Sequence, residues 1–327
     1  MKVLVCGGAG YIGSNMTAML AAEGHEPIVF DNLSKGHKAA IGNNEFVLGD
    51  LADYELLVKT LNRFKIDAVM HFAAFIEVGE SVKEPLRYYY NNVSNTQNLL
   101  SAMEEAGVEK FVFSSTAAVY GMPREVPIKE DLHKNPINPY GDSKWAVERM
   151  CHWQSQAGKL RYAALRYFNA CGAGDRCRLG EDHRPESHLI PLIIQAAMGK
   201  RADIKIYGTD YPTPDGTCIR DYIHIEDLCR AHLLALNELS KNCELVYNLG
   251  NGKGYSVKEV IETVKTVSGK DFKVSATGRR PGDPPVLTSD AAKAKKELGW
   301  KPQIPQLEKI VETAWKWHNK YPDGYAD

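Results

Sequence analysis

Tyr140 and Lys144 lie one helical turn apart in the stretch PYGDSKW (139–145). Asn138 and Pro139 are typical of an N-cap and of a first helical position. We therefore expect a helix that starts at Pro139 and carries the phenol and the ammonium on one face. A phenol ordinarily has a pKa of about 10, and a neighbouring positive charge favours its phenolate form. The spacing predicts a general base that removes a proton from an alcohol.

The stretch KFVFSST (110–116) brings hydroxyl groups to the same chemistry. Its apolar residues predict a buried strand that ends in Ser114, Ser115 and Thr116. Tyr-x-x-x-Lys is common by chance, and in isolation it describes a surface tyrosine beside a solvated lysine. Its place one helix after a strand that ends in hydroxyls favours the catalytic interpretation.

The first half of the chain alternates short β-branched runs with amphipathic stretches. Strands are expected in KVLVC, PIVFD, EFVLGD, DAVMHFAA and KFVFSS, and helices from about Tyr11, through Leu61, over about 85–106 and from Pro139. This alternation predicts an α/β fold with a Rossmann-type doubly wound parallel sheet. Such a sheet binds its ligand at the carboxyl ends of the strands.

A glycine-rich loop joins the first expected strand to the first expected helix in VLVCGGAGYIGS (3–14). Glycine permits positive φ and a close approach of the backbone to a diphosphate, which the N–H groups and the dipole of the helix N-terminus then bind. A glycine triplet alone is weak evidence, but here a strand and a helix flank it as a dinucleotide site requires. The loop therefore predicts NAD binding through Gly7, Gly10 and Gly13.

Two aspartates end the next strands. Asp31 lies 18 residues after Gly13, where a carboxylate binds the adenosine ribose and repels a 2′-phosphate, which favours NAD over NADP. The alternative for Asp31 is a tight turn followed by an N-capping aspartate. Asp50 could contact adenine or cap the following helix, and the sequence does not decide between the two.

Bound NAD should also act on the predicted base. The positive charge of an oxidised nicotinamide should lower the pKa of Tyr140 further than Lys144 does.

After about residue 170 the pattern becomes irregular. Residues 172–220 are rich in Gly, Pro, Asp and His around one expected helix, HLIPLIIQAAMG, and one short strand, IKIYG. Alternation resumes with a helix from about Glu226 to Leu239 and the strand ELVYNLG, followed by a helix from Ser256 and two short helices at the end. We expect an NAD-binding domain at 1–170, to which 221–250 returns, and a smaller, irregular α/β substrate domain formed mainly by 171–327.

Charge and composition exclude several classes of function. Lysine plus arginine (40) balances aspartate plus glutamate (41), and no basic run is long enough to follow a phosphate backbone, so we expect no nucleic-acid partner. No apolar stretch approaches the roughly 20 residues that span a bilayer. Seven scattered cysteines without CxxC are typical of reduced thiols. We expect a cytoplasmic protein with no membrane partner.

No metal site is expected from the sequence. The ten histidines form no HExxH motif, and the cluster GEDHRPESH (Gly180 to His188) has a spacing that fits no metal-ligand template. We interpret this cluster as a mobile loop near the substrate.

Taken together, these motifs resemble those of the extended short-chain dehydrogenase/reductase family, the NAD-dependent epimerases and dehydratases. The resemblance covers essentially the whole chain, in GGAGYIGS, DNLSKG, HFAAFIEVGESV, YYYNNVSNT, SSTAAVYG, PYGDSK, LRYFNACGA, HLIPLI, RDYIHIEDL, YNLGNG and RRPGD. It implies an isomerase that interconverts UDP-galactose and UDP-glucose through a transient 4-keto sugar, with tightly bound NAD. It also implies a homodimer.

The resemblance assigns roles residue by residue. Tyr140 is the base, Lys144 lowers its pKa and binds the nicotinamide ribose, and Thr116 hydrogen-bonds the sugar O4. The remaining NAD contacts are Tyr11, Ile12, Asp31, Asn32, Leu33, Ser34, Lys35, Gly36, Asp50, Leu51, Phe72, Ala73, Ala74, Ile76, Asn91 and Phe168. The UDP-sugar contacts are Asn169, His188, Arg220, Arg280, Asp283 and Leu287, with the two arginines clamping the diphosphate.

Four positions differ from common patterns of the family or vary within it. Thr116 stands where serine is also frequent, and Ile76 stands where many relatives have a lysine near the cofactor diphosphate. His188 replaces an asparagine that is frequent at this substrate-binding position. Leu287 is of intermediate size at a position whose bulk influences whether a 2-acetamido group fits, although plain packing would also explain it.

Three alternative functions share the fold. A 4,6-dehydratase carries Asp-Glu after the Ser/Thr, where this chain has Ala117 and Ala118, so we disfavour it. A non-catalytic NAD sensor often loses the tyrosine or the lysine, and both remain here. A 4-epimerase acting on UDP-N-acetylhexosamines or UDP-pentoses shares every catalytic group and stays open.

Overall fold

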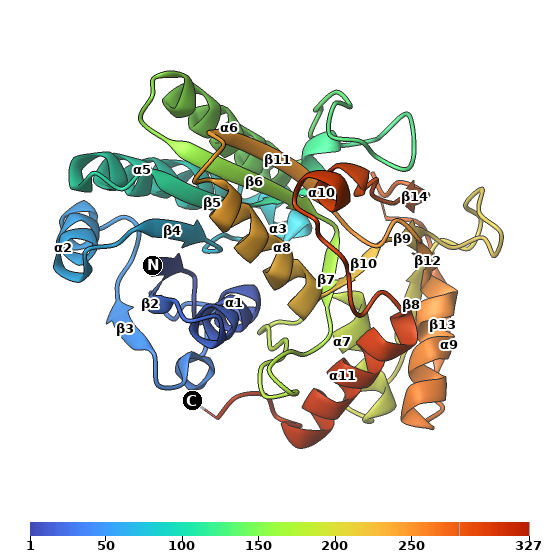
Figure 1. The fold of residues 1–327 in the computed structure, drawn as a ribbon. Coiled ribbons are helices and arrows are strands. Elements are labelled where there is room, and N and C mark those ends of the chain that lie inside the picture. The colour runs from blue at the N-terminus through green and yellow to red at the C-terminus, as the bar shows by residue number, and fades with distance from the viewer. Residues whose placement is uncertain (281, 327) are drawn as a thin grey trace.

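The computed structural model describes residues 1–280 and 282–326, and its centre is a seven-stranded parallel sheet (Figure 1). The strand order is β11-β6-β5-β4-β1-β2-β3. The strands are β1 (Lys2–Cys6), β2 (Glu26–Asp31), β3 (Glu45–Leu48), β4 (Ala68–His71), β5 (Lys110–Thr116), β6 (Arg161–Tyr167) and β11 (Glu244–Leu249).

The order of the strands reverses between β1 and β4, because the chain builds outward from β1 first on one side and then on the other. This reversal leaves a crevice at the carboxyl ends of the strands, where ligands bind in open α/β sheets. The prediction of a Rossmann-type doubly wound sheet is confirmed. Strand β11, from the second half of the chain, is the edge strand beside β6.

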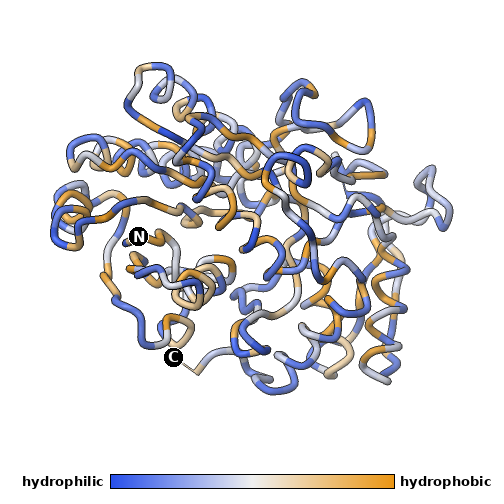
Figure 2. Tube along the Cα trace, in the orientation of Figure 1, coloured by the Kyte–Doolittle hydropathy of each residue, from blue (hydrophilic) through white to orange (hydrophobic). Residues whose placement is uncertain are grey.

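Helices cover both faces of the sheet (Figure 1). On one face lie α1 (Tyr11–Ala22) and α8 (Ile225–Glu238), and on the other lie α2 (Tyr54–Phe64), α5 (Asn95–Ala106) and α6 (Pro139–Gln156). Successive strand residues point to opposite faces, so Val3 and Val5 join the first core while Leu4 and Cys6 join the second. Strands buried on both faces read as continuous apolar runs, which Figure 2 shows along the sheet.

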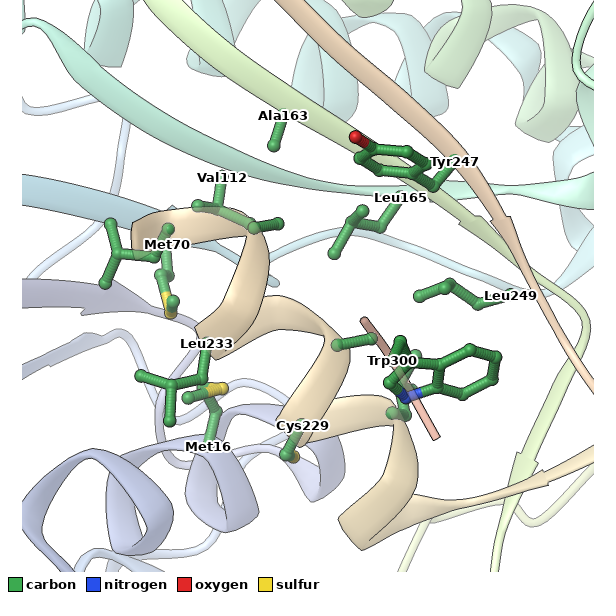
Figure 3. Packing of buried hydrophobic residues seen from close by; sticks show 14 of the residues in the cluster. Met16, Met70, Val112, Ala163, Leu165, Cys229, Leu233, Tyr247, Leu249 and Trp300 are labelled. Atoms are coloured by element: carbon green, nitrogen blue, oxygen red, sulfur yellow. The ribbon is translucent and has the colours of Figure 1, made fainter. Parts of the chain in front are cut away.

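The first core is densely packed. Figure 3 shows Met16 of α1, Met70 of β4 and Leu233 of α8 gathered between the sheet and the two helices. Trp300 is fully buried in the same cluster, and its indole N–H donates to the Asp227 carbonyl at 2.9 Å. The chain beyond residue 290 is thereby anchored to the face of the sheet.

A smaller part of the chain packs around a third core, beside the carboxyl ends of the strands. It contains α7 (Leu189–Ala197), α9 (Val257–Ser268) and α11 (Leu307–Lys320), together with the paired strands β8 (Ile204–Tyr207) and β13 (Val274–Thr277). The short strands β7 (Asn169–Cys171), β9 (Ile219–Arg220), β10 (Tyr222–His224), β12 (Tyr255–Ser256) and β14 (Val286–Leu287) form two further small sheets, and α10 (Ala292–Glu297) follows them. Strands of two or three residues are too short to give a period, which is why the sequence did not predict them.

The helix expected over 85–106 is interrupted. The chain forms α4 (Pro85–Tyr89), a π-helical turn at Tyr90–Ser94 and then α5. Other short elements that the sequence did not predict are α3 (Val78–Lys83) and the 3₁₀ turns Lys38–Ile41 and Ala117–Tyr120. Within the described residues, none of the helices combines the length and the apolar character that crossing a membrane would require.

Candidate active site

A cavity of about 1020 Å³ lies at the carboxyl edge of the sheet and extends under the smaller part of the chain. All the cofactor and substrate residues predicted from the sequence line it, with the exception of Leu33. Leu33 adopts φ 57°, donates its N–H to Asp31 Oδ1 at 2.8 Å and faces a smaller depression beside Lys38. The structure thus brings the two predicted sets of residues into one continuous space.

The glycine loop and α1 form one wall of the cavity. Gly7 has φ +78°, and a Cβ on Gly13 would stand 2.1 Å from the Gly7 carbonyl oxygen, so neither position tolerates a side chain. The N-cap of α1 is Gly10, and no side chain caps its first turn. The uncapped N–H groups and the positive end of the helix dipole are therefore available to an anion, as a dinucleotide requires.

Asp31 and Asp50 line the same wall. The Asp31 carboxylate accepts the Ala9 and Leu33 N–H groups, and burial raises its pKa although these hydrogen bonds oppose the shift. Asp50 accepts a hydrogen bond from the Asn32 side chain at 2.7 Å. The N-cap of α2 is Asp53, whose side chain accepts the Leu56 N–H. The alternative that Asp50 caps this helix is therefore wrong.

The predicted base sits where α6 meets the end of β5. Asn138 accepts the Gly141 N–H at 2.9 Å and Pro139 opens the helix, as the sequence predicts. Tyr140 and Lys144 both line the cavity one turn apart, and the Thr116 hydroxyl lies close enough to Tyr140 to lower the pKa of the phenol. A proton acceptor and a hydroxyl partner are thus side by side on the cavity wall.

Lys144 is only 3% exposed and donates from Nζ to the Ser114 carbonyl at 2.8 Å. Burial lowers its pKa to about 7, against an opposing effect of the Glu148 carboxylate. Burial also raises the pKa of Tyr140, although the Thr116 hydrogen bond lowers it, and Glu77 adds to the rise. The predicted fall in the pKa of Tyr140 is therefore not produced by the side chains alone, because desolvation outweighs them.

A buried polar network holds this region beneath the cavity. Arg166 of β6 forks onto the Glu148 carboxylate, with Nε at 3.0 Å from Oε1, and donates from Nη1 to the Tyr120 hydroxyl at 2.8 Å. Ser115 donates to the same Glu148 oxygen. Because both charges are almost fully buried, loss of one partner would leave an uncompensated charge. The network fixes α6 against β5 and β6.

The far end of the cavity is formed by the smaller part of the chain. Arg220 of β9 pairs with the Asp283 carboxylate, and Arg280 stacks over the Tyr207 ring with its guanidinium carbon 3.9 Å from the centroid. Asn169 donates from its side chain to the Asp221 carbonyl at 2.7 Å. Two forked guanidinium groups on one cavity are suited to a diphosphate.

Part of the cavity wall is hydrophobic. Leu287 of β14 lines the cavity and packs, together with Phe168, against the buried cluster of Val119, Tyr120 and Ile128. Leu287 therefore both packs on this cluster and forms part of the cavity wall.

Several lining residues were not predicted as site residues. Ser114, Tyr167, Glu77, Tyr207 and the pair Glu181 and His183 all face the cavity. The strand-end position of Ser114 was a usable signal. Glu77 and Tyr207 gave none, because they reach the cavity only through the tertiary fold.

The comparisons with known proteins agree with this geometry. Residues 3–250 match the model of the NAD dependent epimerase/dehydratase family. The whole chain is 51% identical to a UDP-glucose 4-epimerase of Halalkalibacterium halodurans, of which 98% is covered.

Two solved structures have the same fold. The UDP-glucose 4-epimerase from Brucella ovis in complex with NAD matches with a TM-score of 0.94 and 46% identity, over 97% of this chain and 98% of that one. The UDP-glucose 4-epimerase from Bifidobacterium longum in complex with NAD⁺ and UDP matches with a TM-score of 0.94 and 37% identity, over 99% and 100%.

Proposed function

Because this chain belongs to the NAD dependent epimerase/dehydratase family, we propose that it is an NAD-dependent isomerase that interconverts UDP-galactose and UDP-glucose. One observation carries the proposal. Tyr140, Thr116 and Lys144 lie on the same cavity as the uncapped N-terminus of α1 and the guanidinium groups of Arg220 and Arg280. A dinucleotide site, a proton acceptor and a diphosphate site are thus within one enclosure.

The described residues fit NAD well. The first turn of α1 would hold the diphosphate, Asp31 would accept the adenosine ribose hydroxyls, and Lys144 would donate to the nicotinamide ribose. When bound, NAD supplies a hydride acceptor and donor for C4 of the sugar. Its positive charge would also oppose the burial that raises the pKa of Tyr140.

The side chains of this protein carry the proton. Tyr140 takes the proton of the sugar O4 hydroxyl and later returns it, while Thr116 hydrogen-bonds O4 and keeps it within reach. The resulting 4-keto sugar must present its other face before reduction. Arg220 and Arg280 hold the diphosphate during this turn, so the sugar stays tethered while it is otherwise free to rotate.

The reaction can be tested without added cofactor. The purified protein is incubated with UDP-galactose and, separately, with UDP-N-acetylgalactosamine, and the 4-epimers are followed by NMR. Formation of UDP-glucose supports both the reaction and a retained cofactor. The second tube measures how far a 2-acetamido group is accepted. No conversion in either tube, with NAD then added, would refute the hexose epimerase proposal.

Tyr140→Phe tests the assigned base. A positioned general base contributes about 10²–10⁴-fold to rate, so we expect turnover to fall by roughly a thousandfold while bound NAD is retained. Tyr54→Phe is a matched control, since its hydroxyl contacts Glu105 on the exposed surface. Turnover in Tyr140→Phe close to that of the control would exclude Tyr140 as the base.

We also infer a homodimer and a cytoplasmic enzyme. Leu86 is 82% exposed and Trp153 65% exposed, on the neighbouring helices α4 and α6, and such large apolar side chains support a covered face there. All seven cysteines are free, which suits a reducing compartment. Light scattering of Leu86→Arg beside the native protein tests the dimer, which this charge should dissociate.

A further inference from the structure

Four side chains of the loop that precedes α7 converge on one point. They are Glu181, His183, Glu186 and His188, and each offers one donor atom, a carboxylate oxygen or a ring nitrogen, all within 4.8 Å of one another. The donors are two imidazoles and two carboxylates. This donor set is typical of a site for a divalent transition metal.

The distances between the donors suit a shared ion. Glu181 Oε1 lies 2.6 Å from His188 Nδ1 and 3.3 Å from His183 Nδ1. Glu186 Oε1 lies 3.6 Å from His188 Nδ1, and Glu186 Oε2 lies 3.8 Å from His183 Nδ1. Four ligands at bond lengths of about 2.0–2.2 Å around a tetrahedral Zn²⁺ stand about 3.4 Å from each other. The observed separations bracket that value.

The donors are paired by charge, but neither Nδ1 atom makes a hydrogen bond of acceptable geometry with a carboxylate. Nδ1 of His183 and Nδ1 of His188 are both buried, and neither has a hydrogen-bond partner of acceptable geometry in the described part of the chain. Neither Nδ1 atom is therefore in line with a neighbouring carboxylate oxygen, although all the donor atoms lie within 4.8 Å of one another. Buried ring nitrogens without a partner are an unexplained cost unless something binds them.

In the described part of the chain, the two imidazoles are the only side-chain cations paired with the carboxylates. Glu181 is 4% exposed, and the Glu186 side chain is 5% exposed. Within residues 1–280 and 282–326 no lysine or arginine is paired with either of them, and the nearby Arg184 contacts Asp182 instead. Buried carboxylates are ordinarily paired with a cation or coordinate a metal.

The cluster is held in place before any ligand arrives. Glu186 Oε1 accepts the backbone N–H groups of Ser187 at 2.7 Å and of His188 at 2.8 Å, which leaves Oε2 free. The loop is tied to the C-terminal segment, because the N–H of Tyr325 donates to Asp182 at 3.0 Å. Such outer contacts orient the ligands of protein metal sites.

We propose that Glu181, His183, Glu186 and His188 bind one Zn²⁺ in a tetrahedral, four-ligand structural site. The ion would neutralise the two carboxylates and fix the loop and the start of α7 against the cavity, which Glu181, His183 and His188 line. It differs from three expectations from the sequence, namely that the loop is mobile, that no metal binds and that His188 contacts the UDP-sugar. The proposed zinc site does not depend on the proposed epimerase activity, so each of the two can be tested without the other.

The metal content of the protein is the direct test. The untagged enzyme is purified without chelator, and zinc is measured per chain by mass spectrometry, in the native protein and in His183→Ala and Glu186→Gln. We expect one zinc per native chain and its loss in both variants. His152→Ala is the control, because this histidine lies on α6 away from the loop and should leave the zinc in place.

A second measurement remains decisive if the variants fold poorly. The native protein is stripped with chelator and titrated with CoCl₂, and tetrahedral coordination gives intense visible bands that ZnCl₂ then removes. A native protein without zinc that also binds neither Co²⁺ nor Zn²⁺ overturns the proposal and leaves a network of ion pairs. Zinc retained equally in His183→Ala and Glu186→Gln overturns it as well, because the ion would then lie elsewhere.

Discussion

The two ends of the cavity hold their charged side chains in different ways. At the reaction end, Lys144 is 3% exposed and is fixed by a backbone carbonyl at the edge of a seven-stranded sheet. At the diphosphate end, Arg220 and Arg280 stand on a two-residue strand and a loop, with a carboxylate and an aromatic ring as their partners. One end is rigid before ligand binds, and the other consists of groups that can exchange partners.

This difference suits the proposed chemistry. Proton transfer needs donor and acceptor within hydrogen-bond reach, and small displacements are costly. A tether only has to hold a diphosphate while the sugar turns. Arg220 is paired with Asp283 in this structure, so binding of a diphosphate by Arg220, as proposed, would compete with an internal ion pair.

Lys144→Met should give the largest effect, because it removes the amino group that lies one helical turn from Tyr140 on the cavity wall. We expect kcat to fall by roughly a thousandfold, within the range for general acid–base groups, with a smaller change in KM. Steady-state kinetics with UDP-galactose measures both. Lys159→Met is the control, since that lysine pairs with Glu104 on the surface. A raised KM with an unchanged kcat would place Lys144 in substrate binding and break the contrast between the ends.

The sequence predicted the rigid end better than the other. The caps at Asn138 and Pro139 and the glycines of the first loop are local signals, and the structure shows the elements that they indicate. The pairing of Arg220 with Asp283 joins residues 63 positions apart, which no local pattern encodes. The direction of the Tyr140 pKa shift was missed for the same reason, because burial is a property of the tertiary fold.

The loop before α7 illustrates the same limit. Its Glu and His residues were visible in the sequence, but their spacing matched no template, and only the fold brings their donor atoms together. The π-helical turn at Tyr90–Ser94 was missed because its residues continue a helical pattern on both sides.

Acid should lower the free energy of unfolding, because three buried histidines are neutral in the folded protein. Burial lowers the pKa of His71 to about 3, and of His232 and His224 to about 4, whereas an unfolded histidine titrates near about 6.5. Below pH 6.5 the unfolded chain binds protons that the folded chain does not. Stability is therefore full above this pH and is lost as pH falls towards 4, by about 1.4 kcal/mol per pH unit for each such histidine.

His224→Asn separates the contribution of the smaller part. The His224 ring caps α8 by accepting the Glu226 N–H, and asparagine can do the same without titrating. Urea unfolding measured from pH 7 to 4.5 should therefore depend less steeply on pH in this variant. His133 is exposed, so His133→Asn is the control, and its free energy of unfolding should depend on pH as steeply as that of the native protein. An unchanged slope in His224→Asn would mean that this histidine is already protonated in the folded state.

Arg220→Lys tests the adaptable end with a smaller effect. Lysine keeps the charge but loses the fork, so we expect KM for UDP-galactose to rise by on the order of tenfold or somewhat more while kcat changes little. The surface change Arg87→Lys, whose partner is Glu80, serves as the control. A loss in kcat as large as that of Lys144→Met would show that the diphosphate end also positions the reacting atoms.

Leu287 lies on the hydrophobic part of the cavity wall and should give the smallest effect. Its side chain faces the cavity and packs with Phe168, so Leu287→Ala enlarges the space beside the sugar, whereas Leu287→Tyr fills it. A contact of this size changes discrimination between substrates by about 1–3 kcal/mol, and we expect the lower end, roughly tenfold, because the neighbouring side chains can relax. The ratio of kcat/KM for UDP-N-acetylgalactosamine to that for UDP-galactose should rise in the alanine variant and fall in the tyrosine variant. If both variants lower the two kcat/KM values equally, Leu287 only supports Phe168, and the boundary between the rigid and the adaptable end lies elsewhere.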